Sequence, residues 1–210
     1  MIKKERYETT ELKCLRSLNK RMHLPVKEKK YYMNLEKGLT GEQQFDKWSS
    51  KLTSKPLILN DLQLEVNHTH FQIDSIFICP ETIYLFEVKN YEGEFYIKGD
   101  EWYTIKGMEI KNPLLQLKKS ESLLRQIFYH LPYNTSIKSY LVFINPEFTL
   151  YHASPNLPIV LPTQMNRFKK KWDKKHIRLT SKEQAIAEKL LSFIWMNPPS
   201  LIYLRTTWIN

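Results

Sequence analysis

The sequence contains little glycine, little cysteine and no long apolar run. Five glycines in 210 residues exclude a collagen-like or glycine-linker architecture. The most apolar windows, residues 140–144 and 190–196, are far too short to span a bilayer. Cys14 and Cys79 provide neither a disulfide framework nor a Cys-x-x-Cys metal clip. Since the charged first residues also lack the apolar segment of a secretory signal, we expect a cytoplasmic protein with no membrane partner.

Three motifs that identify large classes of proteins are absent as well. The chain has no glycine-rich phosphate-binding loop, no Gly-x-Ser-x-Gly elbow and no zinc-finger spacing. We therefore expect no nucleotide cofactor. A hydrophobic content of 42% and an aromatic content of 13% indicate a folded globular chain, and its length fits one domain with elaborations. The oligomeric state stays open, with a dimer as one option.

Positive charge is concentrated in the two flanks of the chain. Residues 1–30 hold ten Lys or Arg against four acids, and residues 162–178 hold seven against one. Residues 31–161 hold twelve against fifteen. An acidic centre between basic arms suits a metal site that must also hold a polyanion, although two solvated helix faces would produce the same bias. We therefore divide the chain into a basic helical arm (1–30), a central domain (31–161) and a basic, helical extension packed on that domain (162–210).

Hydrophobic periodicity predicts an α/β fold in which a central mixed sheet is flanked by helices, with extra helical segments at both ends of the chain. Apolar residues at helical spacing predict helices at residues 3–23, 40–53, 112–131 and 181–196. Short apolar or alternating runs predict strands at residues 57–66, 71–79, 82–89, 94–105 and 137–144.

The start of the second helix has two interpretations. Thr40 and Gln43 resemble a capping box, which would put Glu42 in the first helical turn. Alternatively the helix begins earlier, near Tyr31, and continues through Gly38.

Other helix ends carry clearer signals. Pro25 is expected to end the first helix, and Asn112-Pro113 to begin the third, because Asn caps well and Pro loses no needed N–H at the first position. Thr180 and Glu183 form a capping box for the last helix, which Pro198-Pro199 would close.

The strands at 71–79 and 82–89 gather polar residues into one patch. A turn centred on Pro80 and Glu81 would pair residues whose numbers sum to 161, so Asp74 would lie opposite Glu87. Both faces are otherwise apolar, as expected of a central strand pair, and strict alternation places Ile73 on the same face as Phe77. Pro-Glu is not a preferred two-residue turn, so the register could slip.

The chemistry of this patch follows from its charges. Two opposed carboxylates have Cβ atoms about 4.5–5.5 Å apart and repel each other. A hard divalent cation such as Mg²⁺ would relieve that repulsion at Asp74 and Glu87. Lys89 projects from the same strand face as Glu87, where it could orient or activate a water beside a scissile phosphate. The alternative is a structural salt bridge from Lys89 that neutralises one carboxylate and sets the strand register.

Four short pieces, each on the expected element, carry a resemblance to a known family. In order they are Gly41-Glu42, Gln72-Ile73-Asp74, Glu87-Val88-Lys89-Asn90-Tyr91 with Gly93 following, and Asn112-Pro113-x-x-Gln116. Together they resemble the nuclease-related domain (NERD) family, which is grouped with the PD-(D/E)xK nucleases. The resemblance covers about residues 38–145 and implies a restriction-endonuclease-like core.

The resemblance also implies a reaction and roles for single residues. It implies a nuclease that hydrolyses DNA phosphodiester bonds through a water activated by Mg²⁺ or Mn²⁺. Asp74 and Glu87 would ligate the cation together with the backbone carbonyl of Val88, and Lys89 would position the water. Glu42 would be an accessory acid.

Gln116 would contact the site or the nucleic acid from its helix. Plainer explanations stand beside two of these roles: the helix dipole accounts for a Glu42 in a first turn, and Gln116 could simply be exposed.

The arm after residue 161 carries the strongest basic cluster. Its candidate nucleic-acid-binding residues are Arg167, Lys169, Lys170, Lys171, Lys174 and Lys175. Phe168 and Trp172 are interleaved among them and could stack on bases; alternatively, being four residues apart, they pack on the core while the lysines are solvated. Two further functions therefore remain open: a nucleic-acid-binding module with little or no turnover, and a structural domain whose basic arms bind acidic proteins.

Overall fold

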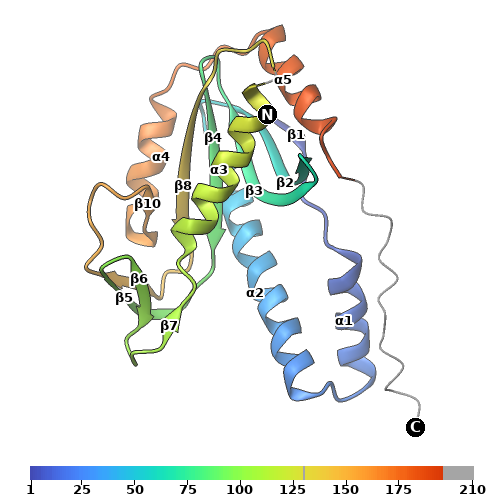
Figure 1. The fold of residues 1–210 in the computed structure, drawn as a ribbon, viewed down its shortest axis with the longest axis vertical. Helices are drawn as coiled ribbons and strands as arrows, with labels where there is room; N and C mark the ends of the chain where they lie inside the picture. Colours follow the sequence, from blue (N-terminus) through green and yellow to red (C-terminus); the bar gives the residue numbers. More distant parts are fainter. Residues whose placement is uncertain (130, 196–210) are drawn as a thin grey trace.

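The computed structural model describes residues 1–129 and 131–195, and its centre is a six-stranded sheet (Figure 1). The strand order is β1 (Ile2–Lys4), β2 (Leu57–Val66), β3 (Thr69–Ile78), β4 (Thr82–Lys89), β8 (Ser136–Phe143) and β10 (Ile159–Val160). The strands β2, β3 and β4 are antiparallel neighbours, whereas β1, β8 and β10 each pair in parallel. The sheet is therefore mixed, as the sequence predicts.

The described residues form five α-helices. They are α1 (Thr10–Arg21), α2 (Val26–Ser49), α3 (Pro113–Tyr129), α4 (Met165–Asp173) and α5 (Ser181–Leu191), with a 3₁₀ turn η1 (Pro162–Gln164) before α4. Four of these helices cover the two faces of the sheet, and α1 packs on α2 (Figure 1). One core cluster joins the sheet to α3 and α5 through residues such as Leu62, Ile76, Leu124 and Ile186. The second joins the opposite face to α2 and α4 through Phe45, Phe77, Phe86 and Trp172. In the described part of the chain, no helix combines the length and apolar character needed to cross a bilayer.

A second, smaller sheet lies beside the central one (Figure 1). Its order is β7 (Glu109–Ile110), β6 (Glu101–Thr104), β5 (Gly93–Lys98) and β9 (Phe148–Tyr151). The sequence predicts strand structure only for its central pair, because β7, β9 and also β10 are too short to show periodicity. Trp102 is fully buried, and the rings of Phe143 and Phe148 stack at 3.8 Å, which joins this sheet to the core of the first.

The N-terminal arm is wrongly predicted in its first part. The expected helix at 3–23 begins only at Thr10, where the Thr9 side chain accepts a hydrogen bond from Leu12 N at 3.2 Å. Residues 2–4 instead form β1, which extends the central sheet by pairing with β2. The Lys4 ammonium reinforces this edge by donating to the carbonyls of Asn60 and Asp61 at 2.8 and 2.7 Å.

The second helix follows the alternative with the earlier start. It begins at Val26, directly after Pro25, which stands at its N-terminal cap and does not end α1. The capping box at Thr40 is wrong, because the Thr40 hydroxyl lies inside the helix and donates to the Glu36 carbonyl at 2.8 Å. Glu42 is therefore far from the first turn, and the helix dipole does not explain its presence.

The later helix ends agree better with the sequence. Asn112 caps α3, since its Oδ1 accepts from Leu114 N at 2.9 Å. Thr180 and Glu183 form the predicted capping box of α5. The helix itself is shorter than predicted and ends at Leu191, and the expected closure at Pro198-Pro199 lies outside the described residues.

Gly41 sets how closely α2 approaches the central sheet. A Cβ atom built there would lie 2.5 Å from Asn90 Cβ and 3.3 Å from Ile144 Cγ2. Asn90 follows β4 directly and donates its side-chain amide to the Lys37 carbonyl at 2.7 Å. The missing side chain therefore allows α2 to cross the end of β4, which brings the adjacent Glu42 to that place.

We expect Gly41→Ala to lower the free energy of unfolding by about 1–3 kcal/mol, because overpacking at a closed contact forces neighbours apart. Gly38→Ala is the matched control in the same helix, where an added Cβ meets nothing within 4 Å. It should raise the free energy of unfolding by about 0.5–1 kcal/mol through helix propensity. Urea unfolding of the three proteins measures both values, and equal effects at the two glycines would contradict the close approach.

Candidate active site

The β3–β4 hairpin has the predicted register but separates before its polar patch. Ser75 pairs with Phe86, and the pairing continues to Ile78 and Ile83, so partner numbers sum to 161 as predicted. Beyond Ser75 the main chains no longer pair: Val88 N donates to Asp74 Oδ2 at 2.7 Å, in the place of a main-chain acceptor. The two strands therefore diverge at Asp74 and leave a gap between them.

The divergence coincides with a break in strand alternation. Ile73 and Ile76 are three residues apart, yet both belong to the core cluster beneath α3 and α5. Leu59 and Leu62 on the neighbouring β2 are also three residues apart and both belong to this cluster. Asp61, which lies between them, has a φ of 52°. Strict alternation would put such residues on opposite faces, so the predicted position of Ile73 beside Phe77 is wrong.

Asp74, Glu87 and Lys89 meet in the gap that this distortion opens. Asp74 is 7% exposed and Glu87 is 1% exposed. Lys89 Nζ donates to Glu87 Oε1 at 2.8 Å and to Gln116 Oε1 at 3.1 Å. The salt bridge that the alternative interpretation expects from Lys89 is therefore formed, but it occupies only one of the two oxygens of Glu87. Within the described residues, Glu87 Oε2 is buried and has no hydrogen-bond partner.

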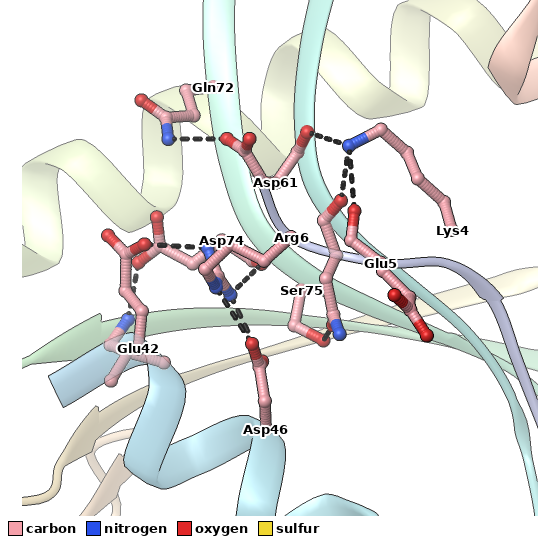
Figure 2. Close-up of polar contacts among 11 residues, drawn as sticks. Lys4, Glu5, Arg6, Glu42, Asp46, Asp61, Gln72, Asp74 and Ser75 are labelled. Atoms are coloured by element: carbon pink, nitrogen blue, oxygen red, sulfur yellow. Dashed lines mark hydrogen bonds and ion pairs between the residues drawn. The ribbon is translucent and has the colours of Figure 1, made fainter. Parts of the chain in front are cut away.

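Glu42 reaches the same place from α2 and is held there by Arg6. Arg6 NH1 donates to Glu42 Oε2 at 2.6 Å, and Arg6 Nε donates to Asp46 Oδ2 at 2.9 Å. The same guanidinium donates to the main-chain carbonyl of Asp74 at 2.8 Å. Figure 2 shows this guanidinium between the two acidic side chains of α2 and the main chain of β3.

Sequence reasoning missed Arg6 entirely. It lies in the arm that we treated as a separate basic segment, and its side chain is only 4% exposed. One arginine among the ten basic residues of that arm carries no local signal. Only the pairing of β1 with β2 brings Arg6 to the carboxylates.

The electrostatics of the cluster follow from burial and crowding. Burial, reinforced by the carboxylates of Glu87 and Glu42, raises the pKa of Asp74 well above its usual value. Burial also raises the pKa of Glu42, although Arg6 opposes this. Burial alone would lower the pKa of Lys89, but the adjacent Glu87 and Asp74 outweigh it and hold the pKa above its usual value. Lys89 is therefore a fixed positive charge beside carboxylates that repel one another.

The main-chain carbonyl of Val88 also faces this gap. In a strand, the N–H and C=O of one residue point to the same neighbouring strand. Val88 N points to Asp74, so its carbonyl does too, whereas the carbonyl of Lys89 turns the other way and accepts from Ile144 N at 3.1 Å. Val88 thus presents an oxygen on the side of the carboxylates, as the sequence prediction requires.

All of these groups open into one cavity of about 790 Å³. Its lining includes every residue predicted to be catalytic or to bind metal, namely Glu42, Asp74, Glu87, Val88, Lys89 and Gln116. Four elements contribute them: α2, β3, β4 and the start of α3. Across the described residues, no group of three or more His, Cys, Asp or Glu side chains is arranged to hold a metal ion alone. Two carboxylates and a carbonyl nevertheless fit Mg²⁺, which protein sites commonly hold through one or two carboxylates together with water and substrate oxygens.

The predicted nucleic-acid-binding residues of the C-terminal arm lie elsewhere, on and after α4. Trp172 is 1% exposed and Phe168 packs beside it on the core, so the alternative of core packing is confirmed and base stacking by Trp172 is wrong. Lys169 pairs with Asp173 at 2.5 Å, and Lys175 donates to the Tyr84 hydroxyl at 2.8 Å. The remaining basic residues of the set, Arg167, Lys170, Lys171 and Lys174, are exposed.

The chain is similar in sequence to one family of proteins. A family model described as "NERD: Nuclease-related domain" matches residues 37–144. No curated protein matches the sequence. A solved structure, protein VC1899 from Vibrio cholerae, is similar at 12% identity and a TM-score of 0.36, over 72% of this chain and 36% of that one. The chain thus spans about a third of the length of that structure.

The raised pKa of Asp74 predicts a specific pH dependence. A carboxyl with a higher pKa in the folded state stabilises the fold while it is protonated, and that stability is lost as the pH rises from its usual pKa of 3.8 through the raised value. Asp74→Asn keeps an oxygen that can accept from Val88 N but cannot ionise. We expect its melting temperature to rise relative to the wild type as the pH increases over that range.

Thermal unfolding from about pH 4 to about pH 8 measures this difference. Asp100→Asn, which removes an exposed carboxylate between β5 and β6, is the control and should follow the wild type. A constant offset between Asp74→Asn and the wild type at every pH would contradict the prediction.

Proposed function

The chain belongs to the nuclease-related domain family, and on that basis we propose that it is a nuclease that hydrolyses DNA phosphodiester bonds with the help of Mg²⁺ or Mn²⁺. The observation that carries the proposal is the Glu87 carboxylate. It is buried beside Asp74 and, in the described part of the chain, one of its oxygens has no partner. A buried acceptor of this kind is costly unless something binds it. A divalent cation would bind that oxygen and would also reduce the repulsion between Glu87 and Asp74.

Asp74 and Glu87 would hold the cation, with the Val88 carbonyl as a third protein ligand. These oxygen donors suit a hard cation, and the open cavity leaves the other coordination positions to water and to phosphate oxygens. When bound, the cation would lower the pKa of a water and offset the negative charge of the transferring phosphate. The chain would therefore supply acidic ligands that are held rigidly on two strands of the central sheet.

Lys89 would act as an oriented donor. Its ammonium is held between Glu87 and Gln116 at 2.8 and 3.1 Å, and its raised pKa keeps it protonated at neutral pH. A protonated lysine cannot accept the proton of the attacking water, so its role is to orient that water or to stabilise charge on a phosphate oxygen. Gln116 fixes the direction of the ammonium. Glu42, held by Arg6, remains an accessory acid at the side of the cavity.

A second candidate function is a nucleic-acid-binding module that keeps the fold without turnover. The ion pairs inside the cluster favour it, because Lys89 already neutralises part of Glu87 and Arg6 part of Glu42. In that case the carboxylates need no cation. Calorimetric titration with Mn²⁺ separates the two functions: binding that Asp74→Asn abolishes supports the nuclease, and no binding to the wild type favours the module.

We expect the wild type to cleave plasmid, linear or single-stranded DNA in the presence of Mn²⁺ and to be inactive in EDTA. Lys89→Ala, Asp74→Asn and Glu87→Gln should each reduce the cleavage rate by about 100-fold or more, since each removes a group aimed at the reacting phosphate or its cation. Glu81→Gln is the control, because it removes an exposed carboxylate at the opposite end of the same hairpin. Gel assays of the five proteins measure the rates.

Two results would count against the nuclease. One is the absence of metal-dependent cleavage by the wild type on all three DNA forms. The other is cleavage that persists unchanged in all three site variants, which would indicate a contaminating enzyme.

A further inference from the structure

A second groove adjoins the active-site cavity, and none of its lining residues comes from α2. It has a volume of about 300 Å³, and its lining includes His70, Lys111 and Lys119. Both cavities share Gln72 and Gln116 as lining residues, so they meet beside Lys89. The carboxylate cluster therefore lies in the first of two adjoining hollows, which we call the two arms of the channel.

The first arm is bordered by a polar stripe on α2. Lys30, Asn34 and Lys37 line the active-site cavity at helical spacing, together with Glu42. At about 1.5 Å per residue, Lys37 lies about 7.5 Å and Lys30 about 18 Å along the helix axis from Glu42. Each strand of B-DNA carries one phosphate per about 3.4 Å of helix axis, so this stripe accompanies a strand for about five nucleotides.

The second arm is basic. Lys111 precedes α3, and Lys119 lies two turns into that helix; both are exposed. Among the described residues that line this groove, none is Asp or Glu. Positive charge is thus found on both sides of the acidic centre, in the places where a polyanion would enter and leave.

We propose that one nucleic-acid strand runs through both arms, with its phosphates against Lys30 and Lys37 on one side of the site and against Lys111 and Lys119 on the other. The phosphate between the two lysine pairs lies at Lys89. The position of cleavage rests on the proposed function, whereas the path of the strand does not. The ligand class is a phosphodiester backbone, since the four lysines are point charges that contact phosphates whatever the base sequence.

The six predicted binding residues on and after α4 form the rival surface. Of the six, Lys169 and Lys175 already bind Asp173 and Tyr84. Neither Lys170 nor Lys171 lines the active-site cavity or the second groove. A strand bound on α4 would therefore lie outside both cavities, away from the carboxylates. For this reason α4 serves as the comparison in the test.

Glu92 provides a substitution that should strengthen binding. It lines the same cavity and pairs with Lys37 at 2.8 Å, with side-chain exposures of 62% and 42%. Such exposed pairs are weak in water, so the pair holds Lys37 near the channel but opposes a phosphate there. Glu92→Gln removes that opposition, and a purely structural role for Lys37 would not predict tighter DNA binding.

Fluorescence anisotropy on the Glu87→Gln background tests the path without cleavage. The probes are a labelled single strand and a duplex of the same sequence, each titrated at several salt concentrations. We expect Lys30→Ala/Lys37→Ala and Lys111→Ala/Lys119→Ala each to weaken binding about tenfold or more at 0.1 M salt. Each pair should also reduce the salt slope by about 1.4 for the single strand or about 1.8 for the duplex. Lys170→Ala/Lys171→Ala should change neither quantity, and Glu92→Gln should tighten binding.

Three results would overturn the proposed path. The first is unchanged binding by both channel variants, and the second is an equal loss in the α4 control, which would indicate general attraction to positive charge. The third is unchanged or weaker binding by Glu92→Gln, which would remove Lys37 from the path. If the wild type cuts no DNA yet binds it through these four lysines, the nuclease proposal fails and the path stands. If the wild type cuts DNA but substitution of these four lysines does not change binding, the proposed path fails and the nuclease proposal stands.

Discussion

The hydrogen bond from Val88 N to Asp74 Oδ2 is the constraint on which the site depends. A regular hairpin would continue its ladder here, and its main-chain groups would satisfy one another. The side chain of Asp74 replaces that rung, so the two strands separate without leaving the Val88 N–H unpaired. The separation exposes the Val88 carbonyl and creates room for Lys89 and Glu87 to face a cavity. A single side-chain acceptor thus converts a buried strand pair into an open site.

The charge balance of the cluster supports the proposal that it binds a cation. Four carboxylates gather there, those of Glu42, Asp46, Asp74 and Glu87, and two fixed cations, Arg6 and Lys89, oppose them. The remainder is two negative charges in a largely buried place. Protonation of Asp74 relieves part of this, which is the direction in which its pKa is shifted. One divalent ion would balance the two negative charges that remain.

Local patterns predicted the sheet well and the site only in part. The bounds of β2 and β4 and the hairpin register follow from apolar runs and one turn, which are local properties. The position of Ile73 does not, because strand alternation breaks between Ile73 and Ile76, beside the left-handed Asp61 of the neighbouring strand. Arg6 and β1 depend on a pairing across more than fifty residues, which no local pattern encodes. The catalytic and metal-binding roles of the site residues, and the nucleic-acid-binding role of the basic residues on and after α4, remain predictions.

The contact between Gly41 and Asn90 links two positions that are distant in sequence and adjacent in space. Asn90 occupies the volume that a side chain at position 41 would need, and it also bonds the main chain of α2 at Lys37. Neither residue can therefore drift alone during evolution. A larger residue at position 41 would be tolerated only in a lineage that already had a smaller side chain at position 90. Covariation of these two columns, rather than the invariance of either, is the signature that this packing would leave in an alignment.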